Sequence, residues 1–478
     1  CHAEVLRRFR RASLARLRAE VEPVEQTALG RFLPAWHGIS PCSTLRAGFG
    51  RERRLRSAAT PEDVLGAVEQ LAGAPVPASA LESLLLPARL PGYSPALLDQ
   101  LTMSGEVTWI GCGSLPGGDG WIALAPTDLA DLVLPDSDEQ LALTPIHRCI
   151  LRALGWDPAG GPAGGGALFF RQLADRTDQY LRADGEPALG DTDVVAAVWD
   201  LVWAGLLTND SLAPLRASVS GRSVAHQPRQ PAPHGRYARM RAGRPPMPSR
   251  AGPPTAAGRW SLSPVSQPPA PKPDPTRRAH ARAETFLERH GVLTRGALGT
   301  ERVAGGFAGV YKVLRAMEES GRCRRGYVVE GLGPAQFAVP GAIDRLRALG
   351  QPGDDSGATV ILAATDPAQP YGAALPWPPT VGAMRRRPGR KAGALAVLVD
   401  GAAVLYVERG GRSMLSFTED TGTLRAAIQA LAGAVQQGWL GSLSVERTDG
   451  QAAPGSALAA LLRDAGFRAT PRGLRIRA

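Results

Sequence analysis

Three segments of the sequence repeat one pattern, in which an apolar helical face leads into a glycine and then into a strand. The glycines are Gly105, Gly205 and Gly321, and apolar residues stand seven and four positions before each glycine and two positions after it. These residues are Leu98, Leu101 and Val107; Val198, Leu201 and Leu207; and Leu314, Met317 and Cys323. Spacings of seven and four place side chains on one helical face, and glycine ends a helix because it adopts the left-handed conformation without strain. General helix grammar could produce such a pattern by coincidence, but the matching flanking helices favour repeated modules.

The third copy, residues 281–339, shows what the module is. Hydrophobic periodicity and turn residues predict three helices and then a hairpin. The expected elements are a helix ending near His290, a short helix over 294–298, a longer helix after Gly305-Gly306, and strands over 327–329 and 336–339 around the turn 331–333. Three helices followed by a β-hairpin are the elements of a winged helix.

The whole chain is then expected to be an α+β multidomain protein, with tandem winged-helix modules followed by a small β-barrel or curved antiparallel sheet module with packed helices. Apolar runs over 359–364, 393–399 and 403–407, with the hairpin signal Asp400-Gly401, predict that last module. The expected domains are the end of a preceding helical or winged-helix module (1–56), winged helices (57–140 and 141–214, the second with a short wing at 206–210), a basic Pro/Arg-rich linker (215–273), a winged helix (274–350) and the β-barrel module (355–478).

Positive charge is concentrated in the expected linker. The formal charge of the chain is +11, and residues 215–273 hold nine arginines, Lys272 and no acid, which is +10 of that total. A ribbon of this kind favours a polyanion, most commonly nucleic acid, although a merely solubilising linker is the alternative. The core of the ribbon combines a base-stacking ring with phosphate-binding cations. Its residues are Arg236, Tyr237, Arg239, Arg241 and Arg244.

Two further basic groups are candidate nucleic-acid contacts. Lys312 and Arg315 lie on the polar face of the third helix of the last winged helix, and Arg324 and Arg325 begin its hairpin. A third helix can lie in a groove while the wing touches phosphates. Arg390 and Lys391 belong to a cluster beside the expected barrel. Solvated faces with ordinary charges are the alternative for all of them.

Several kinds of chemistry are not supported by the sequence. The five cysteines include no CxxC pair, so neither a disulfide framework nor a zinc site is expected, and a reducing cytoplasm is the simple inference. The glycine-rich stretch 160–166 lacks the Lys-Ser/Thr of a phosphate loop, and no GxxxxGK[ST] occurs, so no cofactor is expected to bind. No apolar run reaches membrane-spanning length. The chain begins with Cys1 and is expected to be a piece of a longer protein.

Several long motifs resemble one family. The stretches RFLPAWHGI, GGALFFRQLADR, GRCRRGYVVEGLGPAQFAVPGA, ATDPAQPYGAALPWP and RPGRKAGALAVLVDG resemble the C-terminal region of the bacterial large helicase-related protein (Lhr) family, and the likeness covers essentially the whole chain. The resemblance implies a DNA-repair helicase whose N-terminal motor, using ATP and Mg²⁺, translocates 3′ to 5′ and is absent from this chain. It implies tandem winged helices and a β-barrel similar to the winged-helix DNA glycosylases of the AlkZ type. The paired-glutamine motif of those glycosylases is not recognisable here.

The resemblance also implies function and partners. The leading interpretation is a nucleic-acid-binding and assembly region, located in the cytoplasm with the nucleoid. Its expected partners are single-stranded DNA or a DNA/RNA hybrid, the motor of the same protein, further copies of the chain, and no membrane. The alternatives are a DNA glycosylase for uracil or alkylated bases and a protein-interaction scaffold. For the glycosylase, Asp366 is the candidate catalytic carboxylate, with capping of an Asp-Pro turn as its other reading.

Overall fold

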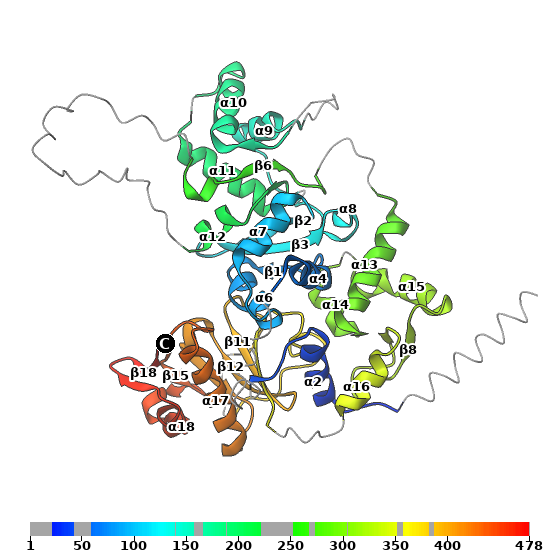
Figure 1. Cartoon of the computed structure of the whole chain (residues 1–478), viewed down its shortest axis with the longest axis vertical. Coiled ribbons are helices and arrows are strands. Elements are labelled where there is room, and N and C mark those ends of the chain that lie inside the picture. Colours follow the sequence, from blue (N-terminus) through cyan, green and yellow to red (C-terminus); the bar gives the residue numbers. More distant parts are fainter. Residues whose placement is uncertain are drawn as a thin grey trace, which may run out of the picture. The chain divides into compact units, whose positions relative to one another are not determined.

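A computed structural model describes residues 22–42, 59–138, 140–156, 166–187, 189–220, 252–266, 273–303, 305–350, 357–381 and 387–477 (Figure 1). The chain divides into two compact units, one formed by Cys1–Pro95 with Pro273–Ala478 and the other by Ala96–Lys272. Within the described ranges, no helix combines the length and the apolar character needed to cross a bilayer.

The three repeated glycines end their helices in the same way. Gly105, Gly205 and Gly321 all have positive φ, at 83°, 75° and 83°. In each copy the N–H of the residue after the glycine donates to the carbonyl of the apolar residue four positions before it: Glu106 to Leu101, Leu206 to Leu201 and Arg322 to Met317. All nine apolar residues of the pattern are buried. The predicted glycine-terminated helices are therefore confirmed in all three copies.

The second unit contains a complete winged helix. Its helices are α9 (Pro145–Ala153), α10 (Phe170–Ala183) and α11 (Asp191–Trp203), and its strands are β4 (Leu168–Phe169), β5 (Leu207–Asn209) and β6 (Arg259–Leu262). The strands form one antiparallel sheet in the order β4-β6-β5. Trp260 of β6 is fully buried and stacks edge-on against Trp199 of α11.

Part of the basic segment that was expected to be a linker is folded, because it contains β6. The wing expected at 206–210 supplies only β5, and its partner strand comes from residues inside the predicted linker. α12 (Ala213–Val219) and the 3-10 turn η4 (Pro254–Ala256) pack on each other within the same unit. Residues 221–251 therefore lie in sequence between two parts of one folded module, because Arg259–Leu262 completes the sheet that β5 began.

The remaining elements of this unit precede that module. They are α7 (Pro95–Ser104), β2 (Val107–Leu115), β3 (Asp119–Pro126) and α8 (Ala130–Val133). β2 and β3 form an antiparallel hairpin. The Trp109 indole donates to the Asn209 carbonyl, and the Thr208 hydroxyl donates to the Trp109 carbonyl, so β2 is fastened to β5.

The first unit contains the last winged helix. Its elements are α13 (Pro275–His290), β7 (Val292–Leu293), α14 (Arg295–Thr300), α15 (Gly306–Glu319), β8 (Arg324–Gly326), β9 (Gln336–Ala338) and α16 (Ala342–Gly350). Its sheet has the order β7-β9-β8, which matches β4-β6-β5 strand for strand. The repeated-module prediction therefore extends to the strand order of these two copies.

One strand of this module lies earlier than expected. β8 ends at Gly326, whereas the sequence pattern favoured a strand over 327–329. The N–H groups of Val328 and Val329 instead donate to the side-chain oxygen of Gln336, whose amide nitrogen donates to the Val329 and Gly333 carbonyls. One buried amide therefore closes the wing loop in place of a backbone ladder.

Short elements at the start of the described chain also belong to this unit. They are α2 (Gln26–Trp36), α4 (Pro61–Leu71), β1 (Val76–Pro77), α5 (Ala78–Ala80), the π-helical turn η2 (Leu81–Leu85) and α6 (Leu86–Arg89). α4 begins with the expected capping box of Thr60 and Asp63. Arg31 of α2 donates to the carbonyls of Leu349 and Asp400, so α2 is tied to α16 and to the C-terminal sheet.

The C-terminal part of the unit is built on a six-stranded sheet in the order β10-β11-β12-β13-β15-β16. Its strands are β10 (Thr359–Ala363), β11 (Leu395–Val399), β12 (Ala402–Val407), β13 (Ser413–Ser416), β15 (Arg447–Thr448) and β16 (Gln451–Ala452). Neighbours are antiparallel except β13 and β15. The expected hairpin at Asp400-Gly401 is confirmed, and both residues have positive φ. Over the described residues the sheet is open, with β10 and β16 as its edges, so the barrel itself is not confirmed.

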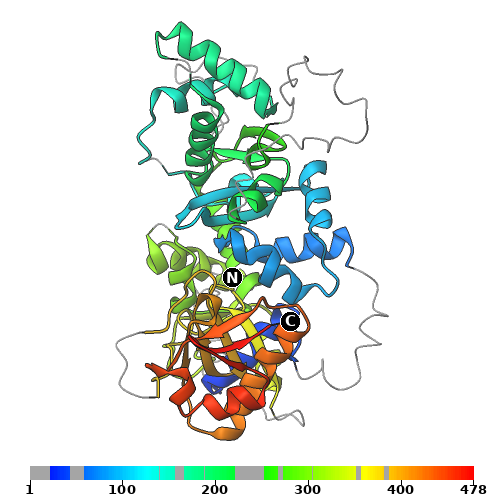
Figure 2. The same cartoon turned by 90° about the vertical axis from the view of Figure 1, so that its left-hand side faces the viewer.

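Helices and a second sheet pack on this sheet (Figure 2). α17 (Thr421–Gln436) covers β10, β11 and β12, and its Leu424, Ile428, Leu431 and Val435 are buried there, as their helical spacing predicts. The second sheet has the order β14-β18-β17. The remaining elements are β14 (Leu443–Val445), β17 (Arg468–Thr470), β18 (Gly473–Ile476), α18 (Ala459–Asp464) and the 3-10 turns η5 (Arg409–Gly411) and η6 (Ala453–Gly455).

Candidate functional site

Helix α15 presents a basic face. Its Val310, Leu314 and Met317 are buried, whereas Lys312 and Arg315 are exposed. The exposed face begins with residues that carry almost no side chain: Gly305, Gly306, Ala308 and Gly309. Arg315 lies 3.5 Å from Glu319, and the structure shows no ion pair between Lys312 and any described residue. A strand of nucleic acid could therefore approach the start of this helix closely and meet cations further along it.

The wing beside α15 divides the predicted arginines into two groups. Arg324 is exposed at the start of β8. Arg325 is half-buried, where it contacts the Tyr311 hydroxyl and lies 3.9 Å from Glu318. Lys312, Arg315 and Arg324 are thus exposed to solvent, and Arg325 supports the packing of the wing against the helix. Phosphate contact by the exposed residues stays a prediction.

The corresponding helices of the other two modules differ in charge. α7 contains no Lys or Arg, and its exposed residues include Gln100 and Met103. α11 also lacks Lys and Arg, and it exposes Asp191, Asp193 and Asp200. A negatively charged helix repels phosphate. Among α7, α11 and α15, each the third helix of its module, α15 is therefore the one whose charge suits nucleic acid.

The ends of the basic segment are neutralised within the second unit. Arg216 forms a two-pronged pair with Asp99, and Arg259 pairs with Asp210 at 2.6 Å. The core of the segment, Arg236, Tyr237, Arg239, Arg241 and Arg244, lies outside the described residues. Its contact with nucleic acid stays a prediction.

Arg390 and Lys391 have different environments. The Arg390 guanidinium donates to the carbonyls of Thr365, Asp366 and Gln369. Burial lowers the pKa of Arg390 to about 10, although Asp366 and Glu301 oppose that shift. Lys391 is 56% exposed and lies 3.3 Å from Glu408. Lys391 is accessible to a phosphate, whereas Arg390 holds together the loop that follows β10.

Asp366 is buried in that loop, with only 1% of its surface exposed. Its two carboxylate oxygens accept hydrogen bonds from Arg89 at 2.7 and 2.9 Å. Oδ1 also accepts from the Ala368 N–H at 2.8 Å, which is the turn-capping role expected of an Asp-Pro pair. That role is confirmed, and the catalytic role stays a prediction.

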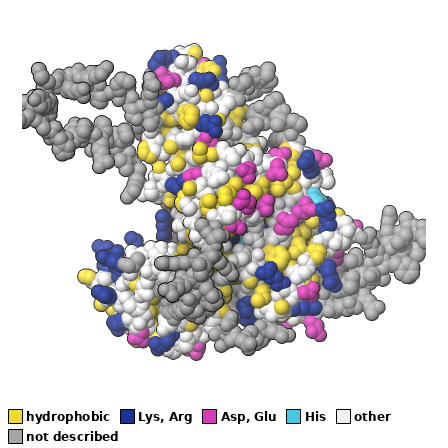
Figure 3. Space-filling view, viewed as in Figure 1, with side chains coloured by type: hydrophobic (Ala, Val, Ile, Leu, Met, Phe, Trp, Pro, Cys, Tyr) yellow, Lys and Arg dark blue, Asp and Glu magenta, His cyan; other side chains and the backbone are white. Residues whose placement is uncertain are grey.

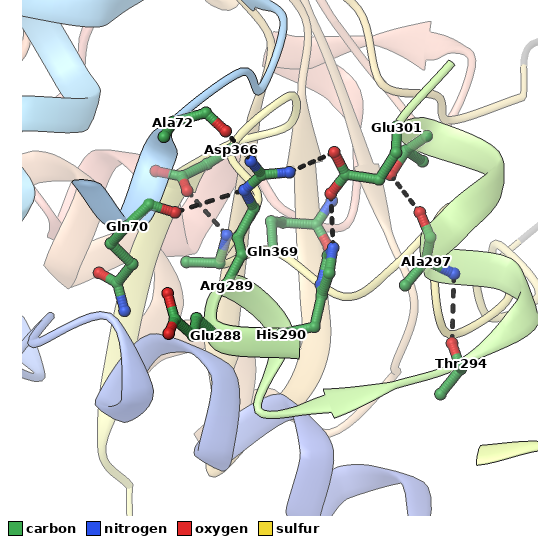
Figure 4. A network of polar contacts seen from close by, with 12 residues as sticks. Gln70, Ala72, Glu288, Arg289, His290, Thr294, Ala297, Glu301, Asp366 and Gln369 are labelled. Carbon is green, nitrogen blue, oxygen red and sulfur yellow. Dashed lines mark hydrogen bonds and ion pairs between the residues drawn. The ribbon is translucent and has the colours of Figure 1, made fainter. Parts of the chain in front are cut away.

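A network of buried charges lies beside the ion pair of Arg89 and Asp366 (Figure 4). Arg289, at the end of α13, contacts Glu301 and the carbonyls of Gln70 and Ala72. His290 lies 2.7 Å from the other oxygen of Glu301. Burial alone raises the pKa of Glu301, but Arg289 and His290 outweigh it and bring the pKa down to about 2. The carboxylate is therefore ionised and fully paired.

His37 connects the two halves of the network. Its Nδ1 lies 2.9 Å from Nη2 of Arg89, and its Nε2 lies 3.0 Å from the Arg289 carbonyl. A guanidinium only donates, so Nδ1 accepts and Nε2 carries the proton that is donated to Arg289. Burial, and then Arg89, His290 and Arg289, hold the pKa of His37 well below its usual value. The ring is neutral.

Sequence reasoning did not find this network, because its members are far apart in the chain and follow no motif. It fastens α2, α6, α13 and the loop after β10 to one another through buried ion pairs and hydrogen bonds. Among the described residues, no cluster of three or more His, Cys, Asp or Glu side chains is arranged to hold a metal ion. The arrangement can fix the relative positions of these elements, and through them the placement of α15.

Comparison with known proteins identifies the family. Residues 24–127 and 272–358 match two domain models, each described as a winged-helix domain of the large helicase-related protein. The chain is similar over its full length, at 46% identity, to "Lhr helicase/ probable uracil glycosylase" of Mycolicibacterium smegmatis. Over 98% of its length it is 34% identical to "Lhr helicase/uracil glycosylase" of Escherichia coli. The chain spans about 30% of the length of each relative. The chain therefore belongs to the large helicase-related (Lhr) family and corresponds to the C-terminal region of such a protein.

Proposed function

We propose that this chain is the nucleic-acid-binding and assembly region of an ATP-dependent DNA-repair helicase, and that α15 with its wing contacts the strand. The observation that carries the proposal is the charge contrast among the three modules. α15 exposes Lys312 and Arg315, whereas α7 and α11 contain no Lys or Arg. The names of the relatives support a helicase as the whole protein.

The contact would combine fit and charge. The small residues Gly305, Gly306, Ala308 and Gly309 leave room for the sugar-phosphate backbone at the start of α15, where the helix N–H groups point outward. Lys312 and Arg315 follow along the same face, and Arg324 extends it onto the wing. The expected strand is single-stranded DNA or a DNA/RNA hybrid.

The arginine-rich core at 236–244 is part of the same proposal. It lies in sequence between β5 and β6, within the wing of the second module, and wings commonly touch phosphates. Tyr237 among four arginines suits base stacking beside phosphate contacts. The expected partners are the motor of the same protein and further copies of the chain. A closed barrel over 355–478, with the six-stranded sheet as its wall, also remains part of the proposal.

The test measures the affinity of the chain for a labelled single-stranded oligonucleotide as salt is raised. We expect the triple variant Lys312→Ala, Arg315→Ala, Arg324→Ala to make the plot of log association constant against log salt shallower. The magnitude of its negative slope should fall by about 2, because each phosphate contact on a single strand contributes about 0.7. The matched control removes three exposed arginines elsewhere in the same unit: Arg277→Ala, Arg425→Ala, Arg463→Ala. Equal slopes for the triple variant and the control would contradict the placement of the site on α15.

A DNA glycosylase is the second candidate function, favoured by the names of both relatives. The assay incubates the chain with a uracil-containing strand and then treats the product with alkali. Asp366→Asn should abolish scission if Asp366 is catalytic, but it also leaves Arg89 buried without its partner. The double variant Arg89→Met, Asp366→Leu removes both charges and separates these effects. Scission by a folded double variant would rule out catalysis by Asp366.

A further inference from the structure

A row of like charge crosses the small C-terminal sheet. The strand order is β14-β18-β17, so β18 is the central strand. Its Arg475 has two cross-strand partners, Ser444 of β14 and Arg468 of β17. The alternate residues of β18, Leu474 and Ile476, are buried in the core. Side chains alternate along a strand, so Ser444, Arg475 and Arg468 share the outer face of the sheet.

The arginines of this face lack counter-charges. Side chains directly opposite one another in a sheet lie about 5 Å apart at Cβ, where like charges destabilise the pairing. Within the described part of the chain, no ion pair involves Arg468, Arg475 or Arg477. Nε of Arg475 is buried and has no hydrogen-bond partner. The outer face of the sheet therefore carries guanidinium groups to which an anion could bind.

Two nearby acids are engaged elsewhere, and Glu446, which follows β14, is half-buried and forms no ion pair within the described part of the chain. Asp464 pairs with Arg425 at 3.3 Å, and Asp449 accepts hydrogen bonds from the Ser416 N–H and hydroxyl. Space-filling Figure 3 shows Lys and Arg side chains gathered over the C-terminal part of the unit, around the position of β18 and β15 in Figure 1. Arg468 and Arg477 are exposed, and Arg475 is half-buried.

One position of β18 beside the arginine row carries no side chain. The next cross-strand pair is Thr470 with Gly473. Gly473 has a φ of 150°, and a Cβ there would collide with the Val445 carbonyl, so this position stays without a side chain. Arg472 is exposed at the turn and Arg477 is exposed just beyond β18. Arg472 and Arg477 thus add exposed guanidinium groups at the two ends of β18.

We propose that the outer face of the β14-β18-β17 sheet, through Arg468, Arg475 and Arg477, binds the phosphate backbone of a nucleic-acid strand. Guanidinium groups suit this ligand because their planar N–H donors engage phosphate oxygens in pairs. Residues two apart on a strand lie roughly 7 Å from each other, so Arg475 and Arg477 can serve successive phosphates. The inference rests on the proposed function and adds a contact surface separate from α15.

The experiment uses the full chain and a labelled single-stranded oligonucleotide at several salt concentrations. Arg468→Ala, Arg475→Ala is compared with Arg425→Ala, Arg463→Ala, which removes the same charge from the same part of the unit. The first variant should bind roughly tenfold more weakly at 0.1 M salt and lower the salt slope by about 1.4, because two contacts are lost. The control should stay within twofold of the unchanged chain.

Folding is checked by thermal unfolding without DNA, where loss of the like-charge pair should leave the Tm unchanged or higher. If the double variant does not fold, Arg468→Ala, Arg477→Ala takes its place, because both of these side chains are exposed. Equal binding by the sheet variant and the control overturns this inference and leaves the proposed function standing. A chain that binds no oligonucleotide at low salt overturns both.

Discussion

Gly30 of α2 lies against the carbonyl oxygen of Gly401, in the turn between β11 and β12, so closely that a Cβ on Gly30 would collide with that oxygen. This close contact holds α2 against the C-terminal sheet. The Arg31 hydrogen bonds to the carbonyls of Leu349 and Asp400 hold α2 in the same place. This contact brings a segment near the start of the chain into the core of the first unit.

Gly30→Ala should therefore destabilise the first unit, because the added methyl group meets backbone and nothing nearby can move aside. A loss of about 1–3 kcal/mol is expected, as in overpacked cores. Gly66→Ala is the matched control, since Gly66 is exposed within α4 and its Cβ position is open. That change should stabilise by about 1 kcal/mol, from helix propensity. Thermal unfolding of both variants decides the matter, and Tm shifts of the same sign would refute the contact.

Removing Glu301 should expose the cost of the buried network. Glu301→Gln leaves Arg289 buried beside His290 without a carboxylate, and breaking such a pair costs about 3–5 kcal/mol. The control Glu319→Gln breaks the exposed pair with Arg315 and should cost less than about 1 kcal/mol. Denaturant unfolding measures both, and similar losses would mean that the network contributes little.

The same group predicts sensitivity to strong acid. The pKa of Glu301 is lowered to about 2 from an ordinary value of 4.5. The unfolded chain binds this proton first as pH falls, so the stabilisation is complete above pH 4.5 and is lost between pH 4.5 and 2. The variant Glu301→Gln should show a weaker pH dependence of Tm over that range. An identical profile for the variant would contradict the paired carboxylate.

His37 predicts a second effect at milder pH. Its pKa is depressed in the folded protein, so the unfolded chain takes up a proton near pH 6.5 while the folded chain does not. Stability should therefore be full above pH 6.5 and fall as the pH is lowered below it, by at most about 1.4 kcal/mol per pH unit. His37→Gln keeps an acceptor and a donor but does not titrate. Its Tm difference between pH 7.5 and 5.5 should be smaller than that of the unchanged chain.

The wing loop offers a prediction that separates shape from charge. Gln336→Ala removes the amide that accepts from the Val328 and Val329 N–H groups, which are buried. Unpaired buried donors cost about 1–3 kcal/mol each, so the loop should open. Oligonucleotide binding should then weaken although no charge has changed. Gln100→Ala, on the exposed face of α7, is the control, and equal binding by both variants would mean that the loop has no part in the contact.

Helical periodicity and glycine stops were enough to predict the repeated modules. Leu98, Val198 and Leu314 are all fully buried, because local spacing alone determines which side of a helix is apolar. Asp400-Gly401 likewise predicted its own hairpin, since the turn depends only on those two residues. Local features of this kind are readable without knowledge of the tertiary fold.

Longer-range features were not readable in this way. β6 pairs with β5 across about fifty residues, and no local pattern at Arg259–Leu262 shows which strand will receive it. Arg89 and Asp366 are 277 positions apart. Summing charge over whole segments assigned almost all of the excess to the linker and so obscured Arg468, Arg472, Arg475 and Arg477. The alternation of Arg475 and Arg477 with apolar residues in GLRIRA was the available signal.

The return of the chain at β6 makes residues 221–251 an insertion within one module. The elements on either side of it, α12 and η4, pack on each other, and β5 and β6 beyond them pair in one sheet. A protease cut there should leave two fragments that remain associated under native conditions and separate only on denaturation.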